Sequence, residues 1–389
     1  MKRYLIITLL VWLSTLVFYL GGLLVVDPYQ VFHKPWVRDA YFVRDMRVQA
    51  SGIINNSDFD SAIVGTSIAA NFSPAEASRT FSRHFVNLSL DGSFMTERSV
   101  VLDDLLKRKK ISAIIYSLDG FDKDTLQNTP IEPYLYLYDR SRINDVQLYA
   151  TLKYANFLVC RNIVFPGKSA CPNTTDLEHV TEWASNREHA KRFGGLDKWL
   201  AAKNNIQVKG ALREISDAIR TIHSQAPAPV DRSHVLKAAS GRMRIIDENL
   251  VRYISGHPSV RYYLFFPPYS RLKYAILKQS NPEGFEVYLE TIRSVVRECE
   301  KYGNVEVFGF ETEAFPDDIA NYKDTTHYHP RFNSKMLTWM KNGRHRLTPA
   351  NVDAYIETIS HLAAAYRIDA IGNKITSYLE QGGDAGSHP

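Results

Sequence analysis

The sequence predicts an α/β protein in which five parallel strands form a sheet covered by helices, with an N-terminal helix crossing a membrane. Three observations predict this fold: short apolar runs alternate with amphipathic helical patterns, glycine and polar residues follow those runs, and a long uncharged apolar segment opens the chain. The chain has 389 residues, of which 45% are hydrophobic, so it can bury a sizeable core. Its formal charge of +5 is small for this length and gives no indication of nucleic-acid binding.

The first segment has the length of a membrane-spanning helix. An uncharged, mostly apolar run extends from Tyr4 to Val26, enough to cross a hydrocarbon core of roughly 30 Å. A cleaved signal peptide normally has an apolar region of about 7–15 residues and a small-residue cleavage site. Here the run is longer and leads into Asp27-Pro28. We favour a retained signal anchor over residues 1–26, with a cleaved signal peptide as the alternative.

The charges beside this segment predict its orientation. Lys2 and Arg3 precede it, and positive residues tend to stay on the cytoplasmic side. We therefore expect a single pass through a bacterial inner (cytoplasmic) membrane, with the C-terminal domain on the extracytoplasmic side. Residues 27–56 are then a connector between the membrane and that domain.

The strand predictions rest on short apolar runs that end in turn residues. Such runs are typical of parallel strands buried on both faces. The five predicted strands cover residues 61–64, 84–90, 111–120, 260–270 and 304–310.

Amphipathic helical patterns separate these strands. The first begins at Ser73, a good N-cap, with Pro74 at the first helical position and Glu76 at the return position of a capping box. The other principal patterns cover residues 94–110, 233–254, 285–303 and 349–368.

The order of these elements predicts the domain organisation. Residues 57–345 form the main domain, and about residues 122–230 form a helical insertion, because that segment is too long for one crossover. Residues 346–389 contain a C-terminal helix and a glycine-rich end.

The three cysteines predict one further feature. Cys160 and Cys171 bracket a loop containing Pro166 and Gly167, and such a pair can form a disulfide in an oxidising compartment. Two free thiols are the alternative. Cys299 lies in a helical pattern, so we expect a packed and inert thiol.

Polar residues that can carry chemistry follow the predicted strands. In open parallel sheets, functional groups lie in the loops after the carboxyl ends of strands. Gly65-Thr66-Ser67 follows the first strand, Gly92 follows the second, and Asp324 and His327 follow the fifth. Each motif alone has a plainer interpretation, since Gly-Thr-Ser is a common turn and an aspartate beside a histidine often caps a helix. Their order along the chain, however, fits a single mechanism.

Two of these motifs resemble the signature blocks of the SGNH (GDSL-like) hydrolases. The first block of that superfamily is a hydrophobic strand followed by Gly-Asp-Ser, here Val64-Gly65-Thr66-Ser67. Its last block is Asp-x-x-His before the final helix, here Asp324-Thr325-Thr326-His327. With the anchor and the Pro-Pro-Tyr-Ser at 267–270, the chain looks most like the membrane-anchored branch. That branch includes the D-alanyl-lipoteichoic-acid protein DltD and accessory proteins of polysaccharide O-acylation. The resemblance implies a three-layer flavodoxin-like fold over about residues 58–345, without the insertion.

The resemblance also implies roles for individual residues. Ser67 would be the nucleophile, His327 the base that accepts its proton, and Asp324 the group that orients the imidazole. Backbone N–H groups near Ser67 and at Gly92 would stabilise an oxyanion. Gly65 would let the chain turn sharply and present Ser67.

Two positions depart from the family pattern: Thr66 stands in place of the aspartate of the first block, and the second departure bears on the mechanism. The third block of the superfamily supplies an asparagine as an oxyanion donor, and this chain has Asp119 there. A carboxylate does not donate a hydrogen bond unless it is protonated. Asn87, Asn71 or backbone groups would then replace the donor, or the activity would be low or restricted to one acyl donor.

The implied function is a membrane-anchored O-acyltransferase or acyl esterase acting on a cell-envelope glycan or a lipid-linked acyl carrier, with a multi-pass membrane O-acyltransferase as partner. We expect no cofactor, and no metal, since His327 and His329 lack further ligands at suitable spacing. Two alternatives stay open: a catalytically inactive glycan-binding protein with the same fold, and an anchored assembly factor for an envelope complex.

Overall fold

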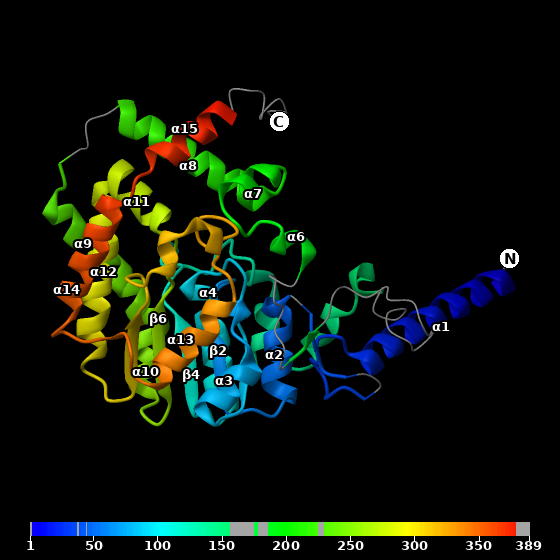
Figure 1. The fold of residues 1–389 in the computed structure, drawn as a ribbon. Coiled ribbons are helices and arrows are strands. Elements are labelled where there is room, and N and C mark those ends of the chain that lie inside the picture. Colours follow the sequence, from blue (N-terminus) through cyan, green and yellow to red (C-terminus); the bar gives the residue numbers. More distant parts are fainter. Residues whose placement is uncertain are drawn as a thin grey trace. The chain divides into compact units, whose positions relative to one another are not determined.

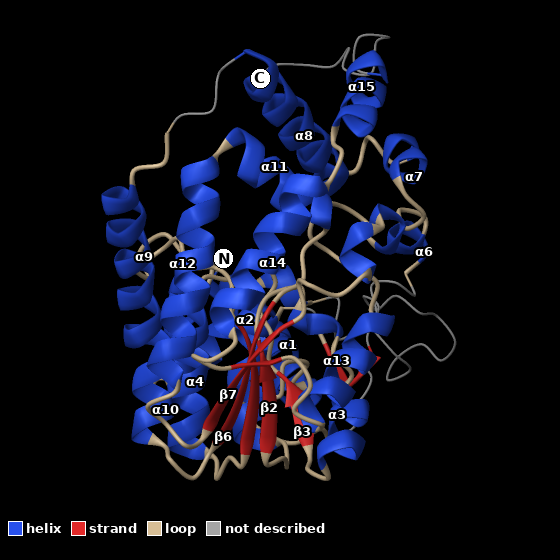
Figure 2. Ribbon diagram, turned by 60° about the vertical axis from the view of Figure 1, so that its left-hand side comes forward, coloured by secondary structure: helices blue, strands red, loops and turns tan. Residues whose placement is uncertain are grey.

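The protein is α/β, with a mixed, mostly parallel sheet of six strands (Figures 1 and 2). The computed structural model describes residues 2–36, 39–43, 45–155, 175–177, 186–224 and 229–378. The chain divides into two compact units, the first made of Met1–Ser112 and Thr125–Thr181, the second of Ala113–Asp124 and Glu182–Pro389. The α/β fold class predicted from the sequence is therefore confirmed.

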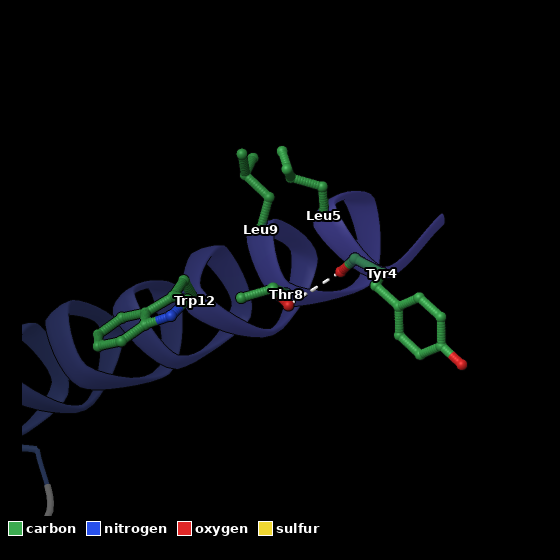
Figure 3. Close-up of a pocket in the computed structure, with 5 residues that line it drawn as sticks. All are labelled: Tyr4, Leu5, Thr8, Leu9 and Trp12. Atoms are coloured by element: carbon green, nitrogen blue, oxygen red, sulfur yellow. Dashed lines mark hydrogen bonds between the residues drawn. The ribbon is translucent and has the colours of Figure 1, made fainter. Parts of the chain in front are cut away.

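Helix α1 (Lys2–Val26) opens the first unit. Among the described residues, it is the one helix long and apolar enough to span a membrane, judged by length and composition. Its first turns expose apolar side chains, and Figure 3 shows Leu5, Leu9 and Trp12 projecting from the ribbon. The Thr8 hydroxyl donates to the Tyr4 carbonyl at 2.9 Å, so this polar group is satisfied within the helix itself. That arrangement suits a hydrocarbon environment, where a polar group finds no water.

The last turns of α1 are packed along one side. Leu23 and Val26 are buried, and the Tyr19 hydroxyl donates to the Thr151 carbonyl. The surrounding apolar cluster includes side chains from three 3₁₀ segments, η2 (Glu132–Tyr138), η3 (Asn144–Leu148) and η4 (Leu152–Tyr154). Helix α1 is thus tied into the first unit by its C-terminal end.

The predicted connector, residues 27–56, contains regular structure. It includes β1 (Tyr41–Phe42), which pairs antiparallel with β5 (Thr175–Asp176), and α2 (Met46–Asn56), most of which is buried. Gly52 lies so close to the backbone of Tyr29 that an added Cβ would sit 2.1 Å from the Tyr29 carbonyl oxygen. Only glycine permits this close approach.

The first unit also contains the first two predicted strands. β2 (Ser61–Val64) pairs in parallel with β3 (Phe85–Asn87). The segment that connects these two strands contains η1 (Ala69–Asn71) and α3 (Pro74–Phe81), and α4 (Met95–Arg108) follows β3. Ser73 caps α3 by accepting from the Glu76 N–H at 3.2 Å, and Pro74 is the first helical residue. The predicted helix start is confirmed.

The second unit holds the other four strands. β4 (Ala113–Ser117), β6 (Arg261–Phe266) and β7 (Val305–Gly309) are parallel neighbours in that order. β8 (Arg346–Leu347) then pairs antiparallel with β7. This last strand corrects the prediction of five parallel strands: the sheet has six and is mixed. A two-residue strand without an apolar run leaves no periodic pattern in the sequence.

Helices make up most of the second unit. Helix α12 (Pro282–Cys299) packs against α9 (Arg232–Ile246), α11 (Arg271–Ser280) and α14 (Val352–Ala365), and α15 (Asp369–Tyr378) packs against α8 (Ile206–Ser224). Cys299 is buried at the end of α12, so the predicted packed position is confirmed, and burial raises the pKa of its thiol to about 12. Cys160 and Cys171 lie outside the described residues, and their disulfide stays a prediction. The other helices described in this unit are α6 (Arg187–Ala190), α7 (Leu196–Ala201), α10 (Arg252–Gly256) and α13 (Arg331–Lys341). The unit also contains a π-helical turn at Asp247–Val251 and the 3₁₀ turns η6 (Phe315–Asp317) and η7 (Ile319–Asn321).

Candidate functional site

A narrow turn between η7 and α13 carries Asp324 and His327 in the second unit. Its two sides meet at an antiparallel bridge between Tyr322 and Tyr328. Inside that bridge, the Lys323 N–H donates to the His327 carbonyl at 3.0 Å. The backbone itself therefore fixes how the aspartate and the histidine face each other.

Asp324 and His327 form a hydrogen-bonded pair. The His327 Nδ1 lies 2.8 and 2.9 Å from the two Asp324 carboxylate oxygens. Asp324 Oδ1 also accepts from the backbone N–H groups of Thr326 at 3.0 Å and His327 at 2.9 Å. With Nδ1 donating to a carboxylate, the imidazole carries its lone pair on Nε2, the tautomer that a general base requires.

The surroundings keep Asp324 ionised. Its side chain is almost completely buried, and burial alone would raise the pKa of the carboxyl group. The charge and hydrogen bond of His327 oppose this effect, helped by Lys323 and the Thr326 amide, and hold the pKa of Asp324 well below its ordinary value. The Asp324 carboxylate is therefore negatively charged at neutral pH, next to the Nδ1 side of the His327 ring.

The loop after β6 supports the same turn. Ser270 donates to the Thr325 carbonyl through its backbone N–H at 3.2 Å and its hydroxyl at 2.7 Å. The Tyr322 hydroxyl donates to the Pro268 carbonyl at 2.7 Å. The loops that follow β6 and β7 thus meet at the carboxyl end of these strands, where open α/β sheets place functional groups.

Asp119 follows β4 at the same end of its strand and is buried. One of its carboxylate oxygens accepts from the Ser117 hydroxyl at 3.0 Å. Burial raises the pKa of Tyr328 well above its ordinary value, and the charge of Asp119 adds to this rise. The Tyr328 hydroxyl is buried and has no hydrogen-bond partner within the described part of the chain. Nothing in the sequence distinguishes this tyrosine from the others.

Ser67 lies in the first unit, directly after β2. From residue 61 to residue 72 it is the one residue that is partly exposed, since all the others are buried. The Asn71 amide donates to the Ser67 carbonyl at 3.1 Å, and the Ala70 N–H donates to the Thr66 carbonyl at 3.0 Å. The sequence therefore presents this serine at the end of a buried strand.

The loop after β3 is joined to the same turn. The Leu90 N–H donates to the Gly65 carbonyl at 2.8 Å. Gly92 has φ = +60°, a left-handed conformation that favours glycine. Gly65, by contrast, is not among the described glycines with a positive φ, so the turn after β2 does not depend on a left-handed residue there.

Asn87 has a structural part in this loop. Its amide nitrogen donates to the carbonyls of Ala69 at 2.8 Å and Phe72 at 3.1 Å, and its oxygen accepts from the Ser89 N–H at 3.0 Å. Both amide protons are thereby engaged, so Asn87 holds η1 in place and offers no free donor to an oxyanion.

The predicted site residues therefore fall into two groups. Ser67, Asn87 and Gly92 belong to the first unit, whereas Asp119, Asp324 and His327 belong to the second. The structure brings Asp324 and His327 together, and the union of this pair with Ser67 in a triad stays a prediction. Among the described residues, no group of three or more His, Cys, Asp or Glu side chains is arranged to hold a metal ion. The chain matches no protein-family model, no curated protein and no solved structure.

Proposed function

We propose that the chain is a membrane-anchored, extracytoplasmic acyltransferase or acyl esterase of the SGNH type, with a flavodoxin-like three-layer fold, acting on a cell-envelope glycan or a lipid-linked carrier. The observation that carries this proposal is the Asp324–His327 pair, in which a buried carboxylate holds Nδ1 and leaves Nε2 as the basic nitrogen. Ser67, partly exposed at the end of β2, is the proposed nucleophile.

The reaction takes two steps. The Ser67 hydroxyl attacks the acyl carbonyl and gives its proton to His327 Nε2, which returns that proton to the leaving alcohol. The acceptor hydroxyl, or water in an esterase, then attacks the acyl-serine and its proton passes through the same nitrogen. Asp324 stabilises the imidazolium formed in each step.

Backbone groups are the proposed oxyanion donors. The N–H of Gly92 and those near Ser67 take this part, because Asp119 is an acceptor bonded to Ser117 and the protons of Asn87 are engaged. The same Asp119 favours a second candidate function, a glycan-binding protein that keeps the fold and has lost the chemistry.

The anchor favours transfer over hydrolysis. An esterase that scavenges soluble esters has no need of a tether, whereas α1 keeps the proposed site close to a membrane-embedded acyl donor. We therefore propose a multi-pass membrane O-acyltransferase as the partner that supplies the acyl group.

A direct assay separates the two candidates. The purified full chain in detergent is incubated with a chromogenic acetyl ester, and Ser67→Ala and His327→Ala are compared with Ser255→Ala and His361→Ala, which alter exposed residues of α10 and α14. We expect both site variants to lose at least about 1,000-fold in kcat/KM while both controls keep their rate. Hydrolysis that survives Ser67→Ala would contradict the proposal.

A further inference from the structure

Glu311, two residues after β7, carries a carboxyl group that the proposed reaction does not use. Its side chain is fully buried, and hydroxyl and amide donors surround it. Oε1 accepts from the Tyr288 hydroxyl of α12 at 2.7 Å. Oε2 accepts from the Phe310 N–H at 2.9 Å and from the Tyr355 hydroxyl of α14. The carboxyl group therefore joins two helices to the end of a central strand.

A further hydroxyl connects this group to the loop after β6. The rings of Tyr288 and Tyr274, a buried residue of α11, are stacked with their centroids 5.7 Å apart, and their hydroxyl oxygens lie 3.4 Å apart. The Tyr274 hydroxyl donates to the Pro267 carbonyl at 3.2 Å and accepts from the Tyr269 N–H at 3.3 Å. A row of polar contacts thus runs from Glu311 to the loop that follows β6.

That loop carries the turn of the candidate site. Ser270 donates to the Thr325 carbonyl through both its N–H and its hydroxyl, at 3.2 and 2.7 Å. The Tyr322 hydroxyl donates to the Pro268 carbonyl at 2.7 Å. These contacts come from consecutive residues of one short loop, so a shift of the loop displaces the turn with it. The position of the Asp324–His327 pair therefore depends on how firmly the loop is held.

The protonation state of Glu311 decides where the Tyr288 hydrogen points. An ionised carboxylate accepts from both tyrosine hydroxyls, whereas a protonated carboxyl group donates one hydrogen itself, so one of its donors must turn away. The Phe310 N–H is fixed by the backbone, and the Tyr355 hydroxyl has no acceptor except Glu311 within the described part of the chain. Tyr288 does have another acceptor, the Tyr274 oxygen. Tyr288 is therefore the hydroxyl that reverses.

The two states differ in how the loop is held. When Glu311 is protonated, an unbroken row of donors runs through both hydroxyls to the Pro267 carbonyl, and hydrogen bonds in such a row strengthen one another. When Glu311 is ionised, the row is interrupted between the two tyrosines, because each gives its hydrogen to another group. Burial raises the pKa of Glu311 to about 7 and the pKa values of Tyr274, Tyr288 and Tyr355 well above their ordinary value. The carboxyl group is thus the member of this network that titrates near neutral pH.

We propose that the Glu311 carboxyl group, acting through two tyrosine hydroxyls, positions the Asp324–His327 turn and holds it more firmly when protonated than when ionised. This inference rests on the proposed function, because acyl transfer is the reaction that needs the turn in a fixed position. It adds a regulation by pH to that site: the turn is held most firmly on the acidic side of neutrality and loosens as pH rises. Glu311, Tyr288 and Tyr274 are then positioning residues.

Hydrogen exchange measured by mass spectrometry tests the coupling without any need for turnover. The full chain in detergent is labelled at pH 5 and pH 8, and the exchange of peptides covering residues 267–271 and 322–329 is corrected for the intrinsic rate at each pH. Labelling times are kept short enough for the amides of α9 to stay unexchanged, so that only local opening is measured. We expect both peptides to be about 3- to 10-fold better protected at pH 5, the factor of one neutral hydrogen bond. Equal protection at the two pH values would overturn the proposal.

Variants assign the effect to the network. Glu311→Gln is neutral and donates at every pH, so both peptides should stay protected at pH 8. Tyr288→Phe interrupts the row, so protection should be low and independent of pH. Tyr302→Phe, at a half-buried tyrosine just after α12, is the matched control and should respond as wild type does. A response to pH that survives in Tyr288→Phe, or one that persists in Glu311→Gln, would contradict the coupling.

The ester assay measures the consequence for catalysis. The ratio of kcat in Glu311→Gln to kcat in wild type cancels every effect of pH that the two chains share. We expect this ratio to be near one at pH 5 and to rise to about 3- to 10-fold at pH 8, with KM unchanged, because the turn acts on chemistry and not on binding. A ratio of one at pH 8 would contradict the positioning role. Ser67→Ala should keep the full exchange response, so a chain without esterase activity refutes the proposed function, while the exchange data still decide the coupling.

Discussion

The Asp324 carboxylate and the His327 ring, three residues apart, are joined at 2.8 Å within one bridged turn. The pair is therefore defined by local backbone geometry. Ser270 and Pro268, in the loop after β6, fix the position of that turn relative to the sheet of the second unit. The aspartate and the histidine are thus held together by a single turn.

Replacing Asp324 by asparagine should impair catalysis while leaving the fold intact. The carboxamide keeps the size of the side chain but removes the charge that holds Nδ1 protonated, so His327 takes the wrong tautomer. We expect kcat to fall by about 100- to 10,000-fold in the ester assay. Asp318→Asn, at an exposed capping residue, is the control and should keep the wild-type rate. Equal rates for wild type and Asp324→Asn would show that the pair has no catalytic part.

Stability should depend on pH through Glu311. This residue is fully buried after β7, where Oε1 accepts from the Tyr288 hydroxyl at 2.7 Å and Oε2 from the Phe310 N–H at 2.9 Å. Burial raises the pKa of its carboxyl group to about 7. The folded state therefore holds the proton more tightly than the unfolded state, and its stabilising contribution is complete below about pH 4.5 and is lost as pH rises to about 7.

The experiment compares the free energy of urea unfolding at pH 5 and pH 8. The Glu311 contribution should fall by about 3 kcal/mol across the titration, most of it between these two values. Glu311→Gln should flatten this pH dependence, and Glu357→Gln, on the exposed face of α14, should leave it unchanged. A pH slope that is the same in Glu311→Gln as in wild type would contradict the assignment.

Asp27 should be essential for holding the C-terminal end of α1 against the rest of the first unit. One carboxylate oxygen accepts from the Val31 N–H at 3.0 Å and the Tyr149 hydroxyl at 2.7 Å, and the other accepts from the N–H groups of Phe32 at 2.8 Å and His33 at 3.0 Å. Asp27→Ala removes the buried carboxylate that accepts from these three N–H groups and the Tyr149 hydroxyl. We expect a loss of at least about 3 kcal/mol in stability and faster protease cleavage just after α1. Asp58→Ala, at an exposed ion pair, should cleave at the wild-type rate. Equal cleavage of Asp27→Ala would show that the helix end is held by other contacts.

The orientation of α1 can be measured with reporters fused after residue 60. Because Lys2 and Arg3 precede the helix, a reporter active only in the periplasm should be active there, and a cytoplasmic reporter at the same position should be silent. Reversal of Lys2 and Arg3 to glutamate should reduce the periplasmic signal. A silent periplasmic reporter with an active cytoplasmic one would exclude the extracytoplasmic assignment.

Local signals were sufficient for several elements. The strand predicted at 61–64 is β2 with the same bounds, because a continuous apolar run between polar turns leaves few alternatives. The cap at Ser73 was also predictable from local sequence, because a serine three residues before the N–H that it accepts from is a signal of a helix start. The closeness of Asp324 and His327 also follows from short spacing.

Features that depend on distant residues could not be predicted. β8 forms where two residues pair with the edge of β7. Asp27 accepts a hydrogen bond from Tyr149, which lies 122 positions further along the chain. Lys323 and His189 are 134 positions apart, and the Lys323 Nζ lies 3.1 Å from the His189 Nδ1. No pattern in the sequence encodes such pairs, because tertiary packing and not local propensity brings them together. The hydrogen bonds of the Asn87 amide could not be predicted either, since its partners are backbone carbonyls of a loop whose course the sequence does not reveal.

Covalent labelling of Ser67 tests the central claim most directly. The full chain in detergent is treated with a fluorophosphonate, which forms a stable ester only with an activated serine hydroxyl, and the modified peptide is identified by mass spectrometry. We predict a single modified serine at position 67, with labelling at least about 100-fold slower in His327→Ala and unchanged in His361→Ala. Labelling of another serine, or no labelling of Ser67 in a folded wild-type chain, would contradict the proposed nucleophile and with it the acyl-transfer function.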